Sequence, residues 1–250
     1  MPRMPSSPRP PQTDLAPITV AQLLFSQGFG TRRECEALVL TGLLRIDGQR
    51  VDDPQQRVAP QGLVFEVEGR SWTYHARALL MLHKPAGYEC SQKPSAWPSV
   101  LTLLPPPLRR RGVQPVGRLD QDTTGLLLLT DDGPLLHKLT SPKHHVPKVY
   151  EAQCAEHVSD AQLQQLTAGV VLHDDPKPVR AAATQRLDDQ LLELTLTEGK
   201  YHQVKRMVAA VGNHVKALHR RSVGGLALPA DLAPGQWRWI DDPAQIFTPR

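Results

Sequence analysis

The chain has 250 residues with a net charge of +4, which suffices for one large domain or for a small and a large one. This weak positive charge is compatible with a polyanionic partner but does not require one, since many basic proteins bind no nucleic acid. Three widely separated cysteines show neither metal nor disulfide spacing, and no membrane-spanning run or secretory signal is present, so we expect a cytoplasmic protein with reduced thiols.

The first part of the chain predicts a tail and a small domain. Residues 1–17 are rich in Pro and Ser and are expected to be a disordered tail. Within the small domain, 18–68, residues 20–27 predict a short helix. Thr31-Arg32-Arg33-Glu34 is a capping box that begins a second helix. Residues 44–51 then predict a hairpin around an Asp-Gly turn.

Arg32 and Arg33 lie in the first turn of that second helix. Cations at this end oppose the helix dipole, so an anion such as phosphate would suit them. They fit ordinary solvated surface arginines equally well. The polar stretch 69–77 is expected to be a linker, and the strand 78–82 begins a larger domain, 78–250.

Asp120 lies in a polar loop between two glycines, Gly117 and Gly125, which permit backbone conformations closed to other residues. The wholly apolar run Leu126–Leu129 follows and predicts a strand that is covered on both faces. After it, Asp132-Gly133 has the composition of a hairpin turn. A buried strand that presents a polar loop in this way is a common arrangement in catalytic sites.

Arg118 and Asp120 are two residues apart and point the same way in an extended loop. Spacing alone is compatible with a catalytic pair or with an ordinary surface ion pair. Asp120-x-Asp122-x-Thr124 also fits the pattern of aspartate-nucleophile phosphatases, which hold Mg²⁺ with such carboxylates. Those enzymes require the apolar strand before the first Asp, whereas here the strand comes after it.

The remaining elements alternate between strands and helices. A strand is expected at 149–154, a helix at 159–168 and a half-buried strand at 191–197. The segment 202–211 predicts a helix with one apolar face. Lys205 lies near the start of this helix, where a cation is disfavoured unless a carboxylate is close; alternatively its amine extends to solvent.

Four segments together resemble one family. The string from Gly117 to Gly133 is similar to the catalytic motif of the RNA pseudouridine synthases, in the branch typified by the small-subunit ribosomal enzyme. His83–Tyr88, Thr140–Tyr150 and Glu198–Met207 resemble further motifs of that family, in the expected order. The first domain, with Arg32-Arg33 and the Asp-Gly hairpin, resembles the S4 RNA-binding domain.

This resemblance implies an α+β fold. A small S4-like domain would be followed by a catalytic domain with a central, mostly antiparallel sheet and flanking helices. The implied reaction converts a uridine of ribosomal RNA, by preference 16S RNA of the small subunit, to pseudouridine after base flipping. Because this isomerisation is redox-neutral, no cofactor or metal is expected.

The resemblance also implies roles for individual residues. Asp120 would act on the sugar, as nucleophile at C1′ or as base at C2′. Lys205 would pair with Asp120 and favour its ionised form. Tyr150 would stack on the target base, and Arg118 would fill the space that the flipped base leaves. The residues expected to contact RNA are Arg32, Arg33, Lys143, His144, His202, Gln203 and Arg206.

We expect a monomer whose substrate is ribosomal RNA, free or in a partly assembled small subunit, with no membrane partner. Three alternatives remain open at this stage. They are a synthase acting on 23S RNA of the large subunit, a Mg²⁺-dependent phosphatase, and a non-catalytic RNA-binding factor for ribosome assembly. The last would tolerate replacement of Asp120 by Asn.

Overall fold

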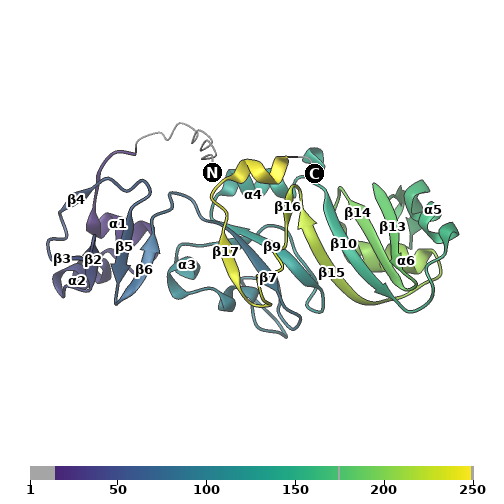
Figure 1. Cartoon of the computed structure of the whole chain (residues 1–250), viewed down its shortest axis with the longest axis horizontal. Coiled ribbons are helices and arrows are strands. Elements are labelled where there is room, and N and C mark those ends of the chain that lie inside the picture. Colours follow the sequence, from purple (N-terminus) through teal and green to yellow (C-terminus); the bar gives the residue numbers. More distant parts are fainter. Residues whose placement is uncertain (1–14, 174, 249–250) are drawn as a thin grey trace, which may run out of the picture. The chain divides into compact units, whose positions relative to one another are not determined.

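The computed structural model describes residues 15–173 and 175–248, so most of the tail expected to be disordered lies outside the described part. The chain divides into two compact units (Figure 1). The first comprises the described residues up to 76 together with 106–111, and the second comprises 77–105 and the residues from 112 onward. No helix of the described residues is long and apolar enough to cross a membrane.

The first unit packs two helices and a four-stranded antiparallel sheet of order β3-β2-β5-β6. Its elements are β1 (Ile18–Thr19), α1 (Val20–Ser26), α2 (Arg32–Leu40), β2 (Leu44–Ile46), β3 (Gln49–Val51), β4 (Arg57–Val58), β5 (Val64–Val67) and β6 (Arg70–Thr73). The β1 and β4 strands pair separately. Leu23, Cys35 and Phe65 belong to the core that joins the helices to the sheet.

Local signals define this unit well. Thr31 caps α2 in the reciprocal arrangement expected of a capping box, with its side chain accepting from the backbone of Glu34. Asp47 and Gly48 both have positive φ angles between β2 and β3, as the hairpin requires. The stretch 69–77, expected to be a linker, contains strand β6, which pairs with β5 along its whole length.

Helix α3 (Pro106–Arg110) and the following Arg111 cluster with the first unit. Nη1 of Arg111 donates to Oε1 of Gln27 at 2.9 Å, and Nη1 of Arg110 donates to the carbonyl of Phe29 at 3.1 Å. Gly28 has a φ of +84°, and a Cβ there would lie 2.1 Å from the carbonyl oxygen of Pro107. The close packing of this inserted segment therefore requires glycine at position 28.

The second unit is built on a nine-stranded sheet whose main path has the order β13-β14-β10-β15-β9-β7-β17. The β15 and β9 strands pair in parallel, and the other strands of this sheet pair antiparallel. Its strands are β7 (Leu79–Lys84), β8 (Gln114–Pro115), β9 (Thr124–Thr130), β10 (Lys148–Cys154), β13 (Ala183–Asp188), β14 (Leu191–Leu196), β15 (Val215–Val223), β16 (Leu226–Ala227) and β17 (Trp237–Trp239). The expected α+β class with a mostly antiparallel sheet is confirmed.

Helices cover the sheet in two places. The α5 (Asp160–Ala168) and α6 (Gln203–Ala210) helices lie at the β13 end of the sheet (Figure 1), where Val204, Met207 and Val208 pack on β10 and β14. The α4 helix (Gly133–Thr140) shares a second core with β7 and β9. The other short elements are η1 (Val100–Leu103), η2 (Pro142–His144), β11 (Val170–Leu172), β12 (Asp175–Val179) and η3 (Pro243–Phe247).

Strand β9 is buried from Gly125 to Thr130, as its unbroken apolar run predicts. The hairpin turn expected at Asp132-Gly133 is wrong. Asp132 is instead the N-cap of α4, and its carboxylate accepts from the backbone N–H of Leu135 at 3.0 Å. Asp is favoured both in turns and at N-caps, and Pro134 in the first helical turn is the residue that distinguishes the two.

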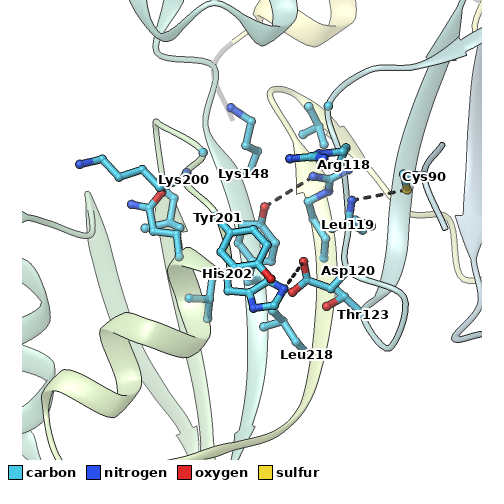
Figure 2. Close-up of a pocket in the computed structure, with 18 of the residues that line it drawn as sticks. Cys90, Arg118, Leu119, Asp120, Thr123, Lys148, Lys200, Tyr201, His202 and Leu218 are labelled. Atoms are coloured by element: carbon cyan, nitrogen blue, oxygen red, sulfur yellow. Dashed lines mark hydrogen bonds and ion pairs between the residues drawn. The ribbon is translucent and has the colours of Figure 1, made fainter. Parts of the chain in front are cut away.

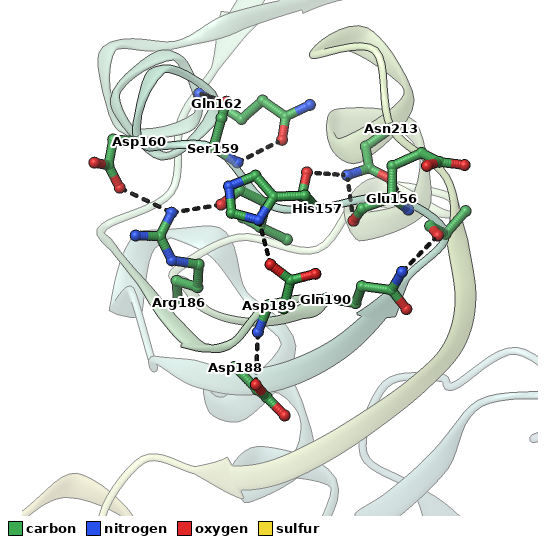
Figure 3. A network of polar contacts seen from close by, with 12 residues as sticks. Glu156, His157, Ser159, Asp160, Gln162, Arg186, Asp188, Asp189, Gln190 and Asn213 are labelled. Atoms are coloured by element: carbon green, nitrogen blue, oxygen red, sulfur yellow. Dashed lines mark hydrogen bonds and ion pairs between the residues drawn. The ribbon is translucent and has the colours of Figure 1, made fainter.

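A polar network fixes the loop before α5 (Figure 3). Asn213 donates from Nδ2 to the carbonyl oxygens of Glu156 and His157, while its Oδ1 accepts from the backbone of Glu156 and His214. All of the amide group's hydrogen-bonding capacity is used, and Asn213 is buried. The network joins the segment around Glu156 to the segment around Asn213 and so has a structural role.

Candidate active site

The loop that carries Asp120 is held in place by a buried lysine. Lys84, at the end of β7, is wholly buried, and its Nζ donates to the carbonyl oxygens of Pro85, Gln121 and Thr123 at 3.1, 3.1 and 2.8 Å. Burial lowers the pKa of this amine. Two of the three carbonyls belong to the loop, so Lys84 fixes the backbone on the C-terminal side of Asp120. The sequence assigned Lys84 to a motif but gave it no role.

Gly125 allows this loop to join the centre of the sheet. It has a φ of +110°, and a Cβ at this position would lie 2.3 Å from the carbonyl oxygen of Arg220. Gly125 pairs with Arg220 in the parallel contact between β9 and β15. The close approach of the two strands therefore requires glycine here. The sequence indicated the unusual backbone conformation but not the approach of the two strands.

Two basic side chains face Asp120. Nε2 of His202 lies 3.3 Å from Oδ1 of Asp120 (Figure 2). Nζ of Lys205 lies 3.4 Å from Oδ2 of the same carboxylate. The carboxylate is partly exposed, with 27% of its side chain accessible. The structure thus brings together Asp120 and Lys205, which the sequence paired, and adds His202 from the N-cap of α6.

Lys205 is closer to a second carboxylate. Its Nζ donates to both oxygens of Asp122, at 2.7 and 2.8 Å. Burial would raise the pKa of Asp122, but the hydrogen bond and charge of Lys205 outweigh it and hold that pKa below its usual range. Burial would likewise lower the pKa of Lys205, but Asp122 and Asp120 raise it. Lys205 is therefore an ammonium shared by two carboxylates rather than the partner of Asp120 alone.

His202 has an unusual backbone and an aromatic neighbour. It adopts the left-handed conformation, with a φ of 47° and a ψ of 33°, which is uncommon outside glycine and is often found at functional sites. Its ring stacks on Tyr201, with centroids 3.8 Å apart and planes inclined by 18° (Figure 2). Tyr201 is 69% exposed. The sequence gave no signal for this stack, which depends on the turn before α6.

Tyr150 lies on β10 opposite Arg220 of β15. Nη1 of Arg220 lies 3.5 Å from the Tyr150 hydroxyl, and the guanidinium carbon lies 5.9 Å from the centre of the ring. Arg220 is only 3% exposed, and its Nε donates to the carbonyl of Leu126 at 2.7 Å. The sequence did not single out Arg220, because an arginine next to Arg221 in a strand resembles a surface residue.

These side chains line one cavity of about 470 Å³, within the size range of small-molecule and base-binding sites. Its lining includes Arg118, Asp120, Tyr150, His202 and Arg220. Lys148 contributes a further basic group, whose pKa is lowered by burial and by the charge of Arg220. Lys205 contacts Asp120 but does not line the cavity itself.

The residues expected to contact RNA have mixed positions. Arg32, Arg33, Lys143 and His144 are exposed, and Arg206 donates to the carbonyl oxygen of Tyr201 at 3.0 Å. Gln203 also lines the cavity. It is only 4% exposed, donates to Glu198 and accepts from the backbone N–H of Lys200, so its amide fixes the turn before α6.

Comparisons with known proteins show which family the chain resembles. A model of the RNA pseudouridylate synthase family matches residues 78–210, and a model of the S4 domain matches residues 20–64. Ribosomal small subunit pseudouridine synthase A of Escherichia coli (strain K12) is 42% identical over 215 residues, which are 86% of this chain and 93% of the relative. The corresponding protein of Yersinia pestis is 46% identical over 216 residues, 86% and 91% of the two chains.

Two further proteins extend the comparison. RNA pseudouridine synthase YtzG of Bacillus subtilis (strain 168) is 41% identical over 224 residues, which cover 88% of this chain and 94% of the relative. A crystal structure of a pseudouridylate synthase matches 92% of this chain and 98% of its own, with a TM-score of 0.64 and 33% identity. This chain belongs to the RNA pseudouridylate synthase family, with an S4 domain preceding its catalytic domain.

Proposed function

We propose that the protein isomerises one uridine of 16S ribosomal RNA to pseudouridine, and that the cavity beside Asp120 receives the flipped base. The N1–C1′ bond breaks, the base turns, and C5 bonds to C1′. The proton lost from C5 is balanced by the one that N1 gains. Reactants and product have the same composition and oxidation state, so the chain's own groups suffice for the proton transfers.

Asp120 is the group we assign to the sugar, as nucleophile at C1′ or as base at C2′. Either role requires an ionised carboxylate that is held in a fixed direction. The contacts from His202 at 3.3 Å and Lys205 at 3.4 Å hold the carboxylate in a fixed direction. They leave the carboxylate partly exposed to the cavity, where a ribose can approach it.

Two further side chains of the cavity receive roles in handling the RNA. Tyr150 would stack on the flipped base, with its hydroxyl held by Arg220. Arg118, two residues before Asp120 and also on the cavity wall, would fill the space that the base vacates in the RNA stack. Filling this gap offsets part of the unstacking cost of a few kcal/mol.

The S4 domain is the part we assign to RNA affinity. Arg32 and Arg33 are exposed in the first turn of α2, where an RNA phosphate would relieve their unfavourable position against the helix dipole. Exposed Lys143 and His144 are further candidates for phosphate contacts. We propose ribosomal RNA as the substrate, free or in a partly assembled small subunit, and this substrate would place the protein in the cytoplasm. We also propose that the protein acts as a monomer.

The observation that carries the proposal is the position of Asp120 between two basic side chains at the wall of a base-sized cavity. Small-subunit RNA is preferred over 23S RNA because relatives with 42% and 46% identity are named small-subunit synthases. A phosphatase fits less well, since strand β9 follows Asp120 and both oxygens of Asp122 are bound by Lys205. A non-catalytic assembly factor would have no use for this arrangement.

The direct test is to map pseudouridine in the ribosomal RNA of a deletion strain that carries wild type, Asp120→Asn or no copy. We expect one 16S uridine to lose its modification in the deletion and to regain it with wild type only. A lost site in 23S RNA would favour the large-subunit alternative. If no site is lost, the synthase proposal fails, and if Asp120→Asn restores the site, the role of Asp120 fails.

A further inference from the structure

We propose that Arg220 is a further catalytic residue: its Nη2 donates a hydrogen bond to a carbonyl oxygen of the target base and stabilises the negative charge that the base takes up when the N1–C1′ bond breaks. This inference rests on the proposed synthase activity. It adds a group that acts on the base to the groups already assigned to the sugar.

The first observation concerns hydrogen bonds that are not made. Within the described part of the chain, two buried side-chain polar atoms lack a hydrogen-bond partner, Nη2 of Arg220 and Oγ1 of Thr123. Both residues line the cavity beside Asp120. Because buried polar groups in native proteins nearly always have partners, the presence of both exceptions at one cavity indicates that a ligand supplies the missing ones.

The second observation is that the guanidinium is already fixed in direction. Nε of Arg220 donates to the carbonyl of Leu126 on β9 at 2.7 Å, and Nη1 lies 3.5 Å from the Tyr150 hydroxyl on β10. The rigid fork of an arginine side chain thereby sets where Nη2 points. A donor fixed before the substrate binds needs no reorganisation as charge develops in the reaction.

The third observation is an uncompensated charge. None of the ion pairs between described residues includes Arg220, although only 3% of this residue is exposed. Lys205, another cation near Asp120, is held by two carboxylates. A buried cation without a counter-ion is unfavourable in the free protein and is therefore suited to an anion that forms only during the reaction.

The proposed chemistry produces such an anion. When the N1–C1′ bond breaks, its electron pair stays on the base and is delocalised onto O2 and O4. The anion then attacks C1′ through C5, the C5 proton leaves, and N1 is protonated. Nη2 donates more strongly to the charged oxygen than to the neutral carbonyl, so Arg220 lowers the barrier to cleavage instead of only binding the substrate.

The test compares Arg220→Met and Arg220→Lys with wild type in single-turnover reactions. A 16S transcript carries either uridine or 5-fluorouridine, and loss of the original nucleoside is followed by chromatography of RNA digests. Fluorine makes the base more acidic and a better leaving group, so it reduces the need for the cation. Arg221→Met is the matched control, because Arg221 is the next residue of β15, is 52% exposed and pairs with Glu151 and Glu193.

For uridine we expect Arg220→Met to lower the cleavage rate by about 100-fold or more, as loss of one preorganised donor does, while the Kd for RNA stays within about threefold of wild type. For 5-fluorouridine the ratio of the wild-type rate to the Arg220→Met rate should be about tenfold smaller than for uridine, since fluorine already stabilises the leaving anion. Arg220→Lys retains a cation but not the aimed Nη2, so its loss on uridine should be intermediate. Arg221→Met should match wild type on both RNAs.

Two outcomes would overturn the role of Arg220. One is an Arg220→Met rate on uridine within about threefold of wild type. The other is that each variant, Arg220→Met and Arg220→Lys, loses the same factor in cleavage rate on 5-fluorouridine as on uridine. Arg220 would then only hold β9 and β10 together. Wild type that converts neither RNA would instead contradict the proposed synthase function.

Discussion

Gly125→Ala tests how closely two central strands approach at the site. The added Cβ would lie 2.3 Å from the carbonyl oxygen and 2.6 Å from the backbone nitrogen of Arg220, so β9 and β15 must move apart. Overpacking of this kind costs about 1–3 kcal/mol, and an unfavourable positive φ adds about 1–2 kcal/mol. We expect a total of about 3 kcal/mol, and at roughly 2–4 °C per kcal/mol the Tm should fall by about 10 °C.

Thermal unfolding followed by circular dichroism measures this loss, with Gly212→Ala as the control. Gly212 has a φ of +79° but nothing within 4 Å of an added Cβ, so its replacement should cost about 1 kcal/mol through the backbone alone. The difference between the two variants isolates the steric contribution. Equal losses of Tm in the two variants would refute the argument that the approach of β9 and β15 excludes a side chain.

Three other variants separate activity from stability. Lys84→Met removes three hydrogen bonds to backbone carbonyls near Asp120 and should lower kcat by about 100-fold through misplacement of the loop, whereas unchanged kcat would contradict its role. Asp122→Asn should lower the Tm by a few degrees at neutral pH, since this partly exposed pair contributes about 1 kcal/mol or less. Pairing with Lys205 lowers the pKa of Asp122. The ion pair therefore stabilises the fold above the ordinary aspartate pKa of 3.8, and this stabilisation is lost as the pH falls through the lowered pKa. A Tm difference between variant and wild type that persists in strong acid would contradict this effect. Asn213→Ala breaks the network of Figure 3 and should lower the free energy of unfolding by about 3 kcal/mol, while kcat stays unchanged. The Tm and the single-turnover rate measure the two effects. A loss of kcat without a loss of Tm would contradict the purely structural role of Asn213.

Much of the fold follows from local signals in the sequence. The capping box at Thr31 begins α2, and the apolar run at 126–129 is a buried strand. One local pattern can fit two structures, as at Asp132, which was expected to form a turn and instead caps α4. The packing of 106–111 with the first unit has no local signal, because that contact joins residues about 80 positions apart and depends on the shape of both surfaces.

The candidate site was predictable in its chemistry but not in its geometry. The motif around Asp120 and the position of Lys205 were sufficient to propose a pair. That Lys205 lies nearer to Asp122 depends on how a loop meets a helix 83 residues away, which no local pattern encodes. The buried positions of Gln203 and Arg220 were missed for the same reason, since polar residues are exposed by default and burial is decided by their tertiary partners.

We propose that Asp120 drives an isomerisation in which the target uridine loses its C5 hydrogen. The most direct measurement is release of tritium to water from a 16S transcript made with [5-³H]uridine and incubated with purified wild type or Asp120→Asn. We predict release that stops at about one equivalent per transcript with wild type and none above background with Asp120→Asn, although the variant still binds the RNA. Equal release by both proteins would contradict the role of Asp120. No release with wild type, on free RNA and on partly assembled subunits, would contradict the proposed isomerisation.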